Sequence, residues 1–172
     1  AFSECRNFGG TLTIPQNIKT ISRFAFSYFG TRTHLIIEEG VEIIDDNAFS
    51  GSSIMGELML PNSIISIGDN AFRGNKISGP LILPPNLSNL SKDAFSYNPG
   101  ICGIIEIPKN LSYIPEYCFY ACSGVEGIRL HKNIDAIGSY AFTNCFSVNS
   151  IICESYNPPF IGIGTFNGVP KD

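Results

Sequence analysis

Aliphatic and aromatic residues return along this chain at a fixed interval. A phenylalanine preceded by Ala, Cys or Thr recurs in steps of 24, 23, 23, 23, 24, 23 and 24 residues, at Phe2, Phe26, Phe49, Phe72, Phe95, Phe119, Phe142 and Phe166. A period of roughly 20–29 residues with regularly placed Leu and Ile is typical of a leucine-rich-repeat solenoid. Each coil of such a fold buries its apolar face against its neighbours, so the pattern predicts about seven stacked coils.

Two aliphatic residues stand two positions apart in each repeat, which is the spacing of one face of a β-strand. The pairs are Leu12/Ile14, Leu35/Ile37, Leu58/Leu60, Leu81/Leu83, Ile105/Ile107 and Ile128/Leu130. Proline follows four of them, at Pro15, Pro61, Pro84 and Pro108, and is expected to end the strand. The pattern therefore predicts one short strand per coil, with its Leu and Ile inward, in one curved parallel sheet.

A second aliphatic pair in each repeat is spaced by three residues, as at Ile18 and Ile21. This spacing predicts a return side of irregular coil, short extended segments and single helical turns, from which the phenylalanine enters the core. Gly68, Gly138 and Gly162 directly follow the second member of the pair, where we expect a turn that needs glycine's conformational freedom. The predicted fold is thus a right-handed leucine-rich-repeat solenoid.

The repeat consensus Cys-x-x-Leu-x-x-Ile-x-Ile-Pro-x-x-Ile-x-x-Ile-Gly-x-x-Ala-Phe resembles the BspA-like leucine-rich repeats of bacterial, and some protist, cell surfaces. The resemblance covers essentially the whole chain, and the closing NPPFIGIGTFNGVP is similar to the degenerate last repeat of such arrays. Glu38 in place of proline, Arg32 in an apolar column and Cys118 in place of Ala depart from the pattern. The resemblance implies an extracellular, cell-surface module that adheres to a ligand.

No change of composition or charge run interrupts the repeats, so residues 1–172 are expected to form a single leucine-rich-repeat domain. The chain starts inside a repeat without an apolar leader, and we expect it to be a fragment of a longer surface protein, with any signal or anchor outside it. The net charge of −4 with 11 Lys and Arg argues against a nucleic-acid partner. Without an apolar run of about 18 residues, membrane insertion by this segment is not expected.

The cysteines follow the repeat as well. Cys5, Cys122 and Cys145 share one column, Cys118 replaces an Ala, and Cys153 stands near an inward strand position. These columns predict buried free thiols. A Cys122–Cys145 disulfide is the alternative, because adjacent strands ~4.8 Å apart lie within disulfide range. Cys118-x-x-x-Cys122 lacks a second ligand pair, so a metal site is not expected.

Catalytic groupings are not apparent in the sequence. His34 and His131 are separated by almost one hundred residues, and no G-x-S-x-G turn accompanies either. Both histidines are expected at the rim of the solenoid. The sequence therefore predicts a protein that is not an enzyme and needs no cofactor.

Strand alternation places one row of residues between the inward pairs on the outer face of the sheet. This central row is Thr13, Ile36, Met59, Ile82, Glu106, Arg129 and Ile152, and its flanking row is Thr11, His34, Glu57, Pro80, Ile104, Gly127 and Ser150. We predict a ligand-binding face centred on Ile36, Met59, Ile82 and Ile104, with Glu106 and Arg129 as its polar border. The alternative is that β-propensity alone placed isoleucine on a pleated surface.

Tyrosines form a second candidate binding surface on the return side, at Tyr113, Tyr117, Tyr120 and Tyr140. Exposed aromatic rings are favoured at sugar and protein contacts, although a tyrosine beside the core phenylalanine can simply cover the core. The sequence thus favours a binding or adhesion module for a protein or host-surface ligand, and another copy of the chain could also cover the face. A passive spacer that holds another domain away from the cell is the second function class.

Overall fold

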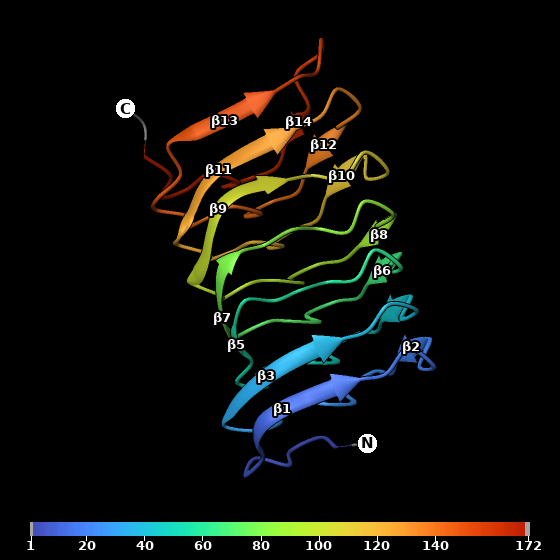
Figure 1. The fold of residues 1–172 in the computed structure, drawn as a ribbon. Coiled ribbons are helices and arrows are strands. Elements are labelled where there is room, and N and C mark those ends of the chain that lie inside the picture. The colour runs from blue at the N-terminus through green and yellow to red at the C-terminus, as the bar shows by residue number, and fades with distance from the viewer. Residues whose placement is uncertain (1, 171–172) are drawn as a thin grey trace.

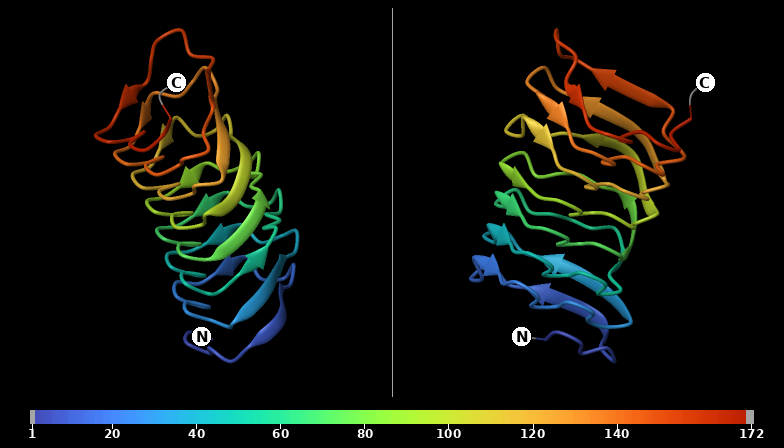
Figure 2. Two further views of the ribbon diagram at one scale, coloured as in Figure 1. Left: turned by 90° about the vertical axis from the view of Figure 1, so that its left-hand side faces the viewer. Right: turned by 180° about the vertical axis from the view of Figure 1, so that it is seen from behind.

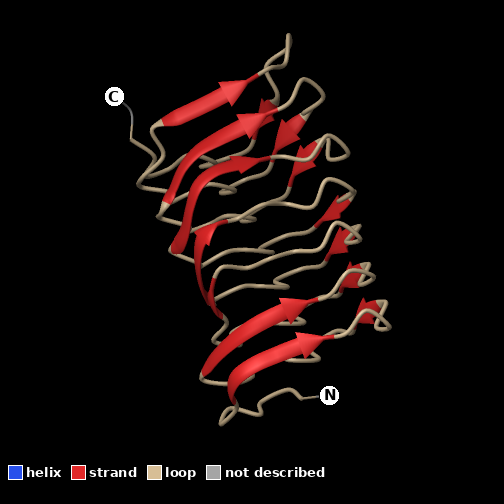
Figure 3. Cartoon of the chain, viewed as in Figure 1, coloured by secondary structure: helices blue, strands red, loops and turns tan. Residues whose placement is uncertain are grey.

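The computed structural model describes residues 2–170, which form fourteen strands and no helix (Figure 3). The coils stack from the N-terminal end at the bottom to the C-terminal end at the top (Figure 1). The predicted solenoid is confirmed. Residue 1 and residues 171–172 of the predicted domain lie outside the described residues. The described part contains no helix long and apolar enough to span a membrane.

Seven strands lie along one side of the stack, all parallel to their neighbours (Figure 2). They are β1 (Gly9–Ile14), β3 (Arg32–Ile37), β5 (Met55–Gly56), β7 (Lys76–Pro80), β9 (Gly100–Glu106), β11 (Val125–Leu130) and β13 (Ser150–Cys153). β1 pairs with β3, and β5, β7, β9, β11 and β13 form a second group in this order, linked to the first by a bridge between Thr33 and Ile54. In β3 the exposure alternates residue by residue, because Leu35 and Ile37 face the core.

Seven two-residue strands lie along another side of the stack (Figure 2). They are β2 (Thr20–Ile21), β4 (Ile43–Ile44), β6 (Ser66–Ile67), β8 (Asn89–Leu90), β10 (Tyr113–Ile114), β12 (Ala136–Ile137) and β14 (Phe160–Ile161). In the first six of them, the second residue is the second member of the spaced-by-three aliphatic pair. The return segments of residues 2–170 are therefore extended or turned, and the predicted single helical turns do not form.

The recurring phenylalanines form one continuous stack through the core. Successive ring centroids from Phe2 to Phe166 are 5.3 to 5.9 Å apart, and the ring planes are within 10° of parallel. The stacked backbone is also hydrogen-bonded, because the amide of Phe49 donates to Ala71 O and that of Phe72 to Ala94 O, both at 2.8 Å. This third hydrogen-bond ladder joins the coils on a side where no strand exists.

Two columns of left-handed residues flank this stack. The first comprises Phe24, Asn47, Asn70, Asp93, Tyr117, Tyr140 and Gly164, and the second Glu4, Tyr28, Gly51, Gly74, Tyr97, Ala121, Asn144 and Gly168. All have φ between 52° and 81°. The two left-handed residues reverse the chain on either side of each phenylalanine, so the ring points inward from a tight turn.

The main sheet is interrupted in the middle of the stack. Leu12 pairs with Leu35, one repeat apart, but Met55 pairs with Lys76 and Ser78 with Gly100, so the register there is shifted by two residues. The shift arises because Gly56, Gly79 and Gly103 adopt positive φ, which breaks the extended backbone as in a β-bulge.

Residues 58–60 and 81–83, predicted as strand centres, follow β5 and β7 instead. Leu58, Leu81 and Leu83 are buried as predicted. The backbone of residues 57–60 and 81–83, however, donates and accepts no hydrogen bond to another coil within residues 2–170. The predicted continuous parallel sheet is wrong at this place.

The glycines of the turn column are required for a different reason from the one predicted. Gly68, Gly138 and Gly162 do not have positive φ. A Cβ atom there would lie 2.7 Å from Asp46 N, 2.5 Å from Glu116 N and 2.4 Å from Ser139 N, respectively. These glycines therefore allow close approach to the backbone of the preceding coil.

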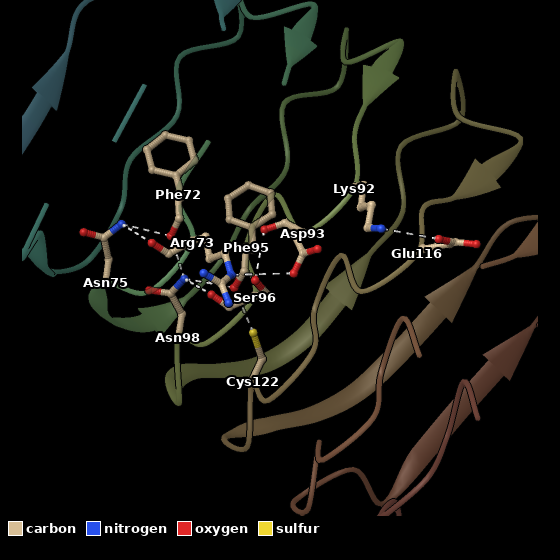
Figure 4. A network of polar contacts seen from close by, with 10 residues as sticks. All are labelled: Phe72, Arg73, Asn75, Lys92, Asp93, Phe95, Ser96, Asn98, Glu116 and Cys122. Atoms are coloured by element: carbon tan, nitrogen blue, oxygen red, sulfur yellow. Dashed lines mark hydrogen bonds and ion pairs between the residues drawn. The ribbon is translucent and has the colours of Figure 1, made fainter. Parts of the chain in front are cut away.

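One column of polar side chains and thiols donates to the phenylalanine carbonyls. Asn75 Nδ2 donates to Phe49 O at 2.8 Å. Asn98 Nδ2 donates to Phe72 O at 2.9 Å, as Figure 4 shows. Ser52 Oγ donates to Phe26 O, Cys122 Sγ to Phe95 O at 3.2 Å and Cys145 Sγ to Phe119 O at 3.3 Å. The column thus satisfies buried carbonyl groups that no strand pairs.

All six cysteines are free, so the alternative of a Cys122–Cys145 disulfide is not realised. Cys118, Cys122 and Cys145 are buried as predicted, but Cys5 and Cys153 are exposed. The prediction failed for these two because they belong to the first and last coils of the structure, which another coil covers on one side only. Burial raises the pKa of the Cys145 thiol from 9.0 to about 12 and also raises that of Cys118 and Cys122.

His131 was predicted to lie at the rim of the solenoid, but it is buried. Its Nε2 lies 3.0 Å from the carbonyl oxygens of Pro108 and of Leu111, and its Nδ1 accepts the amide proton of Asn133 at 3.1 Å. These partners place the ring proton on Nε2. The histidine thus binds two backbone carbonyls in the turn that proline occupies in neighbouring coils.

Candidate binding surface

The four predicted apolar residues all point to solvent. The side chains of Ile36 and Ile104 are 49% and 48% exposed, and those of Met59 and Ile82 are 63% and 68% exposed. Ile36 lies in β3 and Ile104 in β9, whereas Met59 and Ile82 lie on the interrupted segments after β5 and β7. Strand alternation predicted the exposure correctly, although two of the four residues are outside a paired strand.

Met59 and Ile82 together line a groove of about 380 Å³. Glu39, Glu57 and Pro80 also line it. Ile36 and Ile104 lie outside its lining, on strands of the coils to either side. The structure therefore joins two of the predicted residues in one concavity, which opens where the main sheet is interrupted.

The flanking row packs on glycines. A Cβ atom on Gly56 would lie 3.5 Å from the ring of His34, one on Gly103 3.9 Å from Pro80 and one on Gly127 3.2 Å from Ile104. Each of these side chains thus lies over a glycine of the next coil. Because glycine has no side chain, no side chain at these positions covers Ile104, which stays accessible.

The predicted polar border is an ion pair. Arg129 Nε lies 3.4 Å from Glu106 Oε1, and both side chains are partly exposed. Each group therefore neutralises the other at the edge of the apolar face, and a pair this exposed contributes little to stability.

Two carboxylates at the groove have no cationic partner. Glu39 accepts the amides of Asn62 and Ser63 at 2.9 and 3.2 Å, so its carboxylate is fixed at the end of the groove beyond Pro61. Glu57 stands at the other end of the lining segment 57–62, and its side chain lies over Gly79 of the next coil. Neither glutamate has an ion-pair partner within residues 2–170. The groove is consequently apolar in the middle and acidic at both ends.

Glu39 was missed as a site residue because it stands outside the two outward rows of the strands, and Pro80 was assigned to the flanking row and not to the site. Glu57 and Pro80 stand in the flanking row, but only the register shift brings them to the groove. The one signal in the sequence was the EEG stretch at 38–40, where the usual proline is replaced.

Comparison with known proteins decides the family. The sequence profile described as BspA type leucine-rich repeat region (6 copies) matches residues 1–102 and 102–171. The chain belongs to the BspA-type leucine-rich repeat family. The crystal structure of a leucine-rich repeat protein from Bacteroides ovatus superimposes with a TM-score of 0.83 at 22% identity over 98% of this BspA-type chain. This chain covers 43% of the length of that protein, and the likeness supports the fold. No curated protein matches.

The tyrosine surface of the BspA-type chain is only partly assembled as predicted. Tyr117 and Tyr140 are stacked with their ring centroids 5.0 Å apart, and Tyr120 lies 5.7 Å from Tyr117. Tyr97, which the prediction missed, lies 5.2 Å from Tyr120. Tyr113 is in β10, and no ring contact joins it to the others in the described residues; burial and then the charge of Glu116 raise its pKa.

Cations already occupy ring faces of this cluster. Arg73 lies 4.8 Å from the centroid of Tyr97, and Lys92 lies 5.3 Å from that of Tyr117. Asp93 and Glu116 lie 3.8 Å from these cations, as Figure 4 shows for the Lys92–Glu116 pair. The rings thus pack on one another and on their own cations, and fewer faces remain for a ligand than on the sheet side.

Metal-ligating groups do not converge in the described part of the BspA-type chain. Among residues 2–170 no three His, Cys, Asp or Glu side chains come close enough together to hold a metal ion. The arrangement can bind through apolar contact and charge, and these two properties define its candidate chemistry.

Proposed function

We propose that this BspA-type chain is a non-catalytic binding module of an extracellular surface protein, which adheres to a protein ligand through its sheet face. The observation that carries the proposal is the exposed apolar set Ile36, Met59, Ile82 and Ile104 on one face. Membership of a leucine-rich repeat family supports an interaction or surface module.

The packing of the coil supports the same reading. Leu35, Leu58 and Leu81 already fill the inward positions of their coils. The outward Met59 and Ile82 have no role in that core, and a water-exposed surface usually avoids contiguous apolar area unless something covers it. A bound partner would provide this cover.

A passive spacer is the competing function. The first and last described residues lie at opposite ends of the stack, as a spacer requires (Figure 1). A spacer predicts no specific ligand, whereas a binding module predicts one that depends on the sheet face.

An Ile82→Lys variant separates the two functions. Since Ile82 is 68% exposed, the substitution should leave the melting temperature nearly unchanged. Wild-type chain applied to arrays of purified surface and matrix proteins should bind at least one of them, and Ile82→Lys should weaken that binding about tenfold or more.

Ile65→Lys is the matched control, because Ile65 is an exposed isoleucine outside the face, and it should bind like wild type. If wild type binds no protein, the spacer function stands. If Ile82→Lys binds as well as Ile65→Lys, the binding site lies elsewhere.

A further inference from the structure

The groove between Met59 and Ile82 combines apolar walls with one carboxylate at each end. Three cations lie on the outward side of the main sheet: Arg129 is paired with Glu106, and the exposed Arg32 of β3 and Lys76 of β7 are not part of the groove lining, which contains no Lys or Arg. The bound segment should therefore supply positive charge to both ends.

The spacing of the groove specifies the segment further. The groove follows the chain from Glu57 to Asn62, and its far carboxylate, from Glu39, is held at the Asn62 and Ser63 amides. An extended peptide presents residues i, i+2 and i+4 on one side, which places the outer two ~13 Å apart. A Lys or Arg at each outer position can reach a carboxylate while the central apolar side chain contacts Met59 and Ile82.

We propose that the groove binds an extended segment of a partner protein with the pattern basic-x-apolar-x-basic. This inference rests on the proposed function, since it names the chemistry of the ligand at the same face. The exposed amide edges of the interrupted segment are not required, because apolar contact and charge suffice to set the preference.

Fluorescence anisotropy with labelled synthetic peptides tests the pattern. The probe is Gly-Ser-Lys-Ser-Leu-Ser-Lys-Ser-Gly, and two comparison peptides replace both Lys by Glu or the Leu by Ser. The basic-apolar probe should bind about tenfold more tightly than either, and more weakly at about 0.5 M than at about 0.05 M salt. Equal affinity for the Glu peptide would overturn the inference.

Glu→Gln variants test which carboxylates attract the basic probe. Glu57→Gln and Glu39→Gln should each weaken the probe about threefold to tenfold, because the negative charge is lost. Glu39→Gln also replaces one of the two oxygens that accept the Asn62 and Ser63 amides by an NH2 group. Glu154→Gln, an exposed glutamate distant in sequence from the groove lining, is the control and should leave the affinity unchanged. Unchanged binding by both groove variants would overturn the inference.

Failure of the inference can be told from failure of the proposed function. If an array protein requires Ile82 but the basic-apolar probe has no advantage, only the basic pattern is wrong. If the probe binds Ile82→Lys as tightly as wild type while the array protein does not, the probe binds outside the groove and only the inference fails. If the array protein also binds Ile82→Lys unchanged, the proposed sheet face fails as well.

Discussion

Phe72 illustrates how much of this fold is determined by single repeat positions. Its ring is fully buried and stacked between Phe49 and Phe95 at centroid distances of 5.4 and 5.5 Å. Its carbonyl accepts from both Asn75 and Asn98 (Figure 4). Side chain and backbone of one residue thus join three coils.

Phe72→Ala should lower the free energy of unfolding by about 3–5 kcal/mol, because it removes a large side chain from a packed interior. Urea denaturation monitored by circular dichroism measures the change. Ile82→Lys serves as the comparison, since its site is exposed and its midpoint should shift little. An unchanged midpoint for Phe72→Ala would contradict the inward stack.

The buried thiols are expected to lower the stability of the fold as the pH becomes alkaline. The pKa of Cys145 is about 12 in the fold against 9.0 ordinarily, because burial disfavours the thiolate. The full contribution of the neutral thiol to the free energy of unfolding is present below about pH 9. It is lost as the pH rises toward 12, because the thiol ionises in the unfolded chain at a lower pH than in the fold. The free energy of unfolding should fall by up to about 1.4 kcal/mol per pH unit in that window for this thiol.

Urea midpoints at several alkaline pH values measure this slope. Cys145→Ala should show a shallower loss than wild type, whereas Cys153→Ala, which removes an exposed thiol, should follow wild type. Comparison with these variants separates the thiol from other groups that titrate at the same pH. Equal slopes in all three proteins would contradict the buried thiol at Cys145.

At the scale of elements, the hydrogen-bond ladders that join the coils differ in how continuous they are. The phenylalanine ladder runs through the stack, whereas the main sheet is interrupted at residues 57–60 and 81–83. Continuous pairing should protect amides from solvent, and unpaired segments should open with little cost.

Native-state hydrogen exchange should therefore distinguish the two sides of one coil. The amides of Phe72 and Phe95, which donate to Ala94 O and Cys118 O at 2.8 and 3.0 Å, should exchange about a hundredfold or more slowly than those of Met59 and Ile82. Both sets belong to neighbouring coils, so global unfolding affects them alike. Equal protection of Met59 and Phe72 would show a continuous main sheet.

The sequence predicted those features that the same residue type marks in successive repeats. The inward Leu and Ile, the phenylalanine stack and the exposure of Met59 and Ile82 all follow from period and alternation. Only the cysteines of the polar column were recognised, because Ser52 and Asn75 share a donor function with Cys122 and not a side-chain type. The left-handed columns were missed for the same reason, since Tyr, Asp, Asn and Gly all occur in them.

The candidate site was predicted only in part, for a geometric reason. Alternation along a strand gives the direction of a side chain, but the groove depends on a register shift at Gly56 and Gly79. Glu39 reaches the groove from the preceding coil through hydrogen bonds to Asn62 and Ser63. A single sequence does not state such contacts between coils.

At the scale of the whole molecule, stability is expected to be a sum over coils and their interfaces. Equivalent positions in successive coils have the same neighbours, as Asn75 and Asn98 show. A coil removed in register should thus leave the remaining interfaces intact.

Deletion of residues 73–95, which is one 23-residue repeat, joins Phe72 to Ser96 in register. The shortened chain should keep its β circular dichroism and melt about 2–8 °C lower. Deletion of residues 73–84 alone is the control, because it breaks the register, and it should unfold the chain. A folded control or an unfolded in-register variant would contradict independent coils.

The placement of the first and last described residues has a mechanical consequence. They lie at opposite ends of the stack, so tension between them acts along the stacking direction and across the strands (Figure 1). The inter-coil hydrogen bonds then open one coil after another, as in a zipper. Each coil that peels away releases roughly 80 Å of chain, so a tethered molecule can lengthen in steps under load while its remaining coils keep their shape.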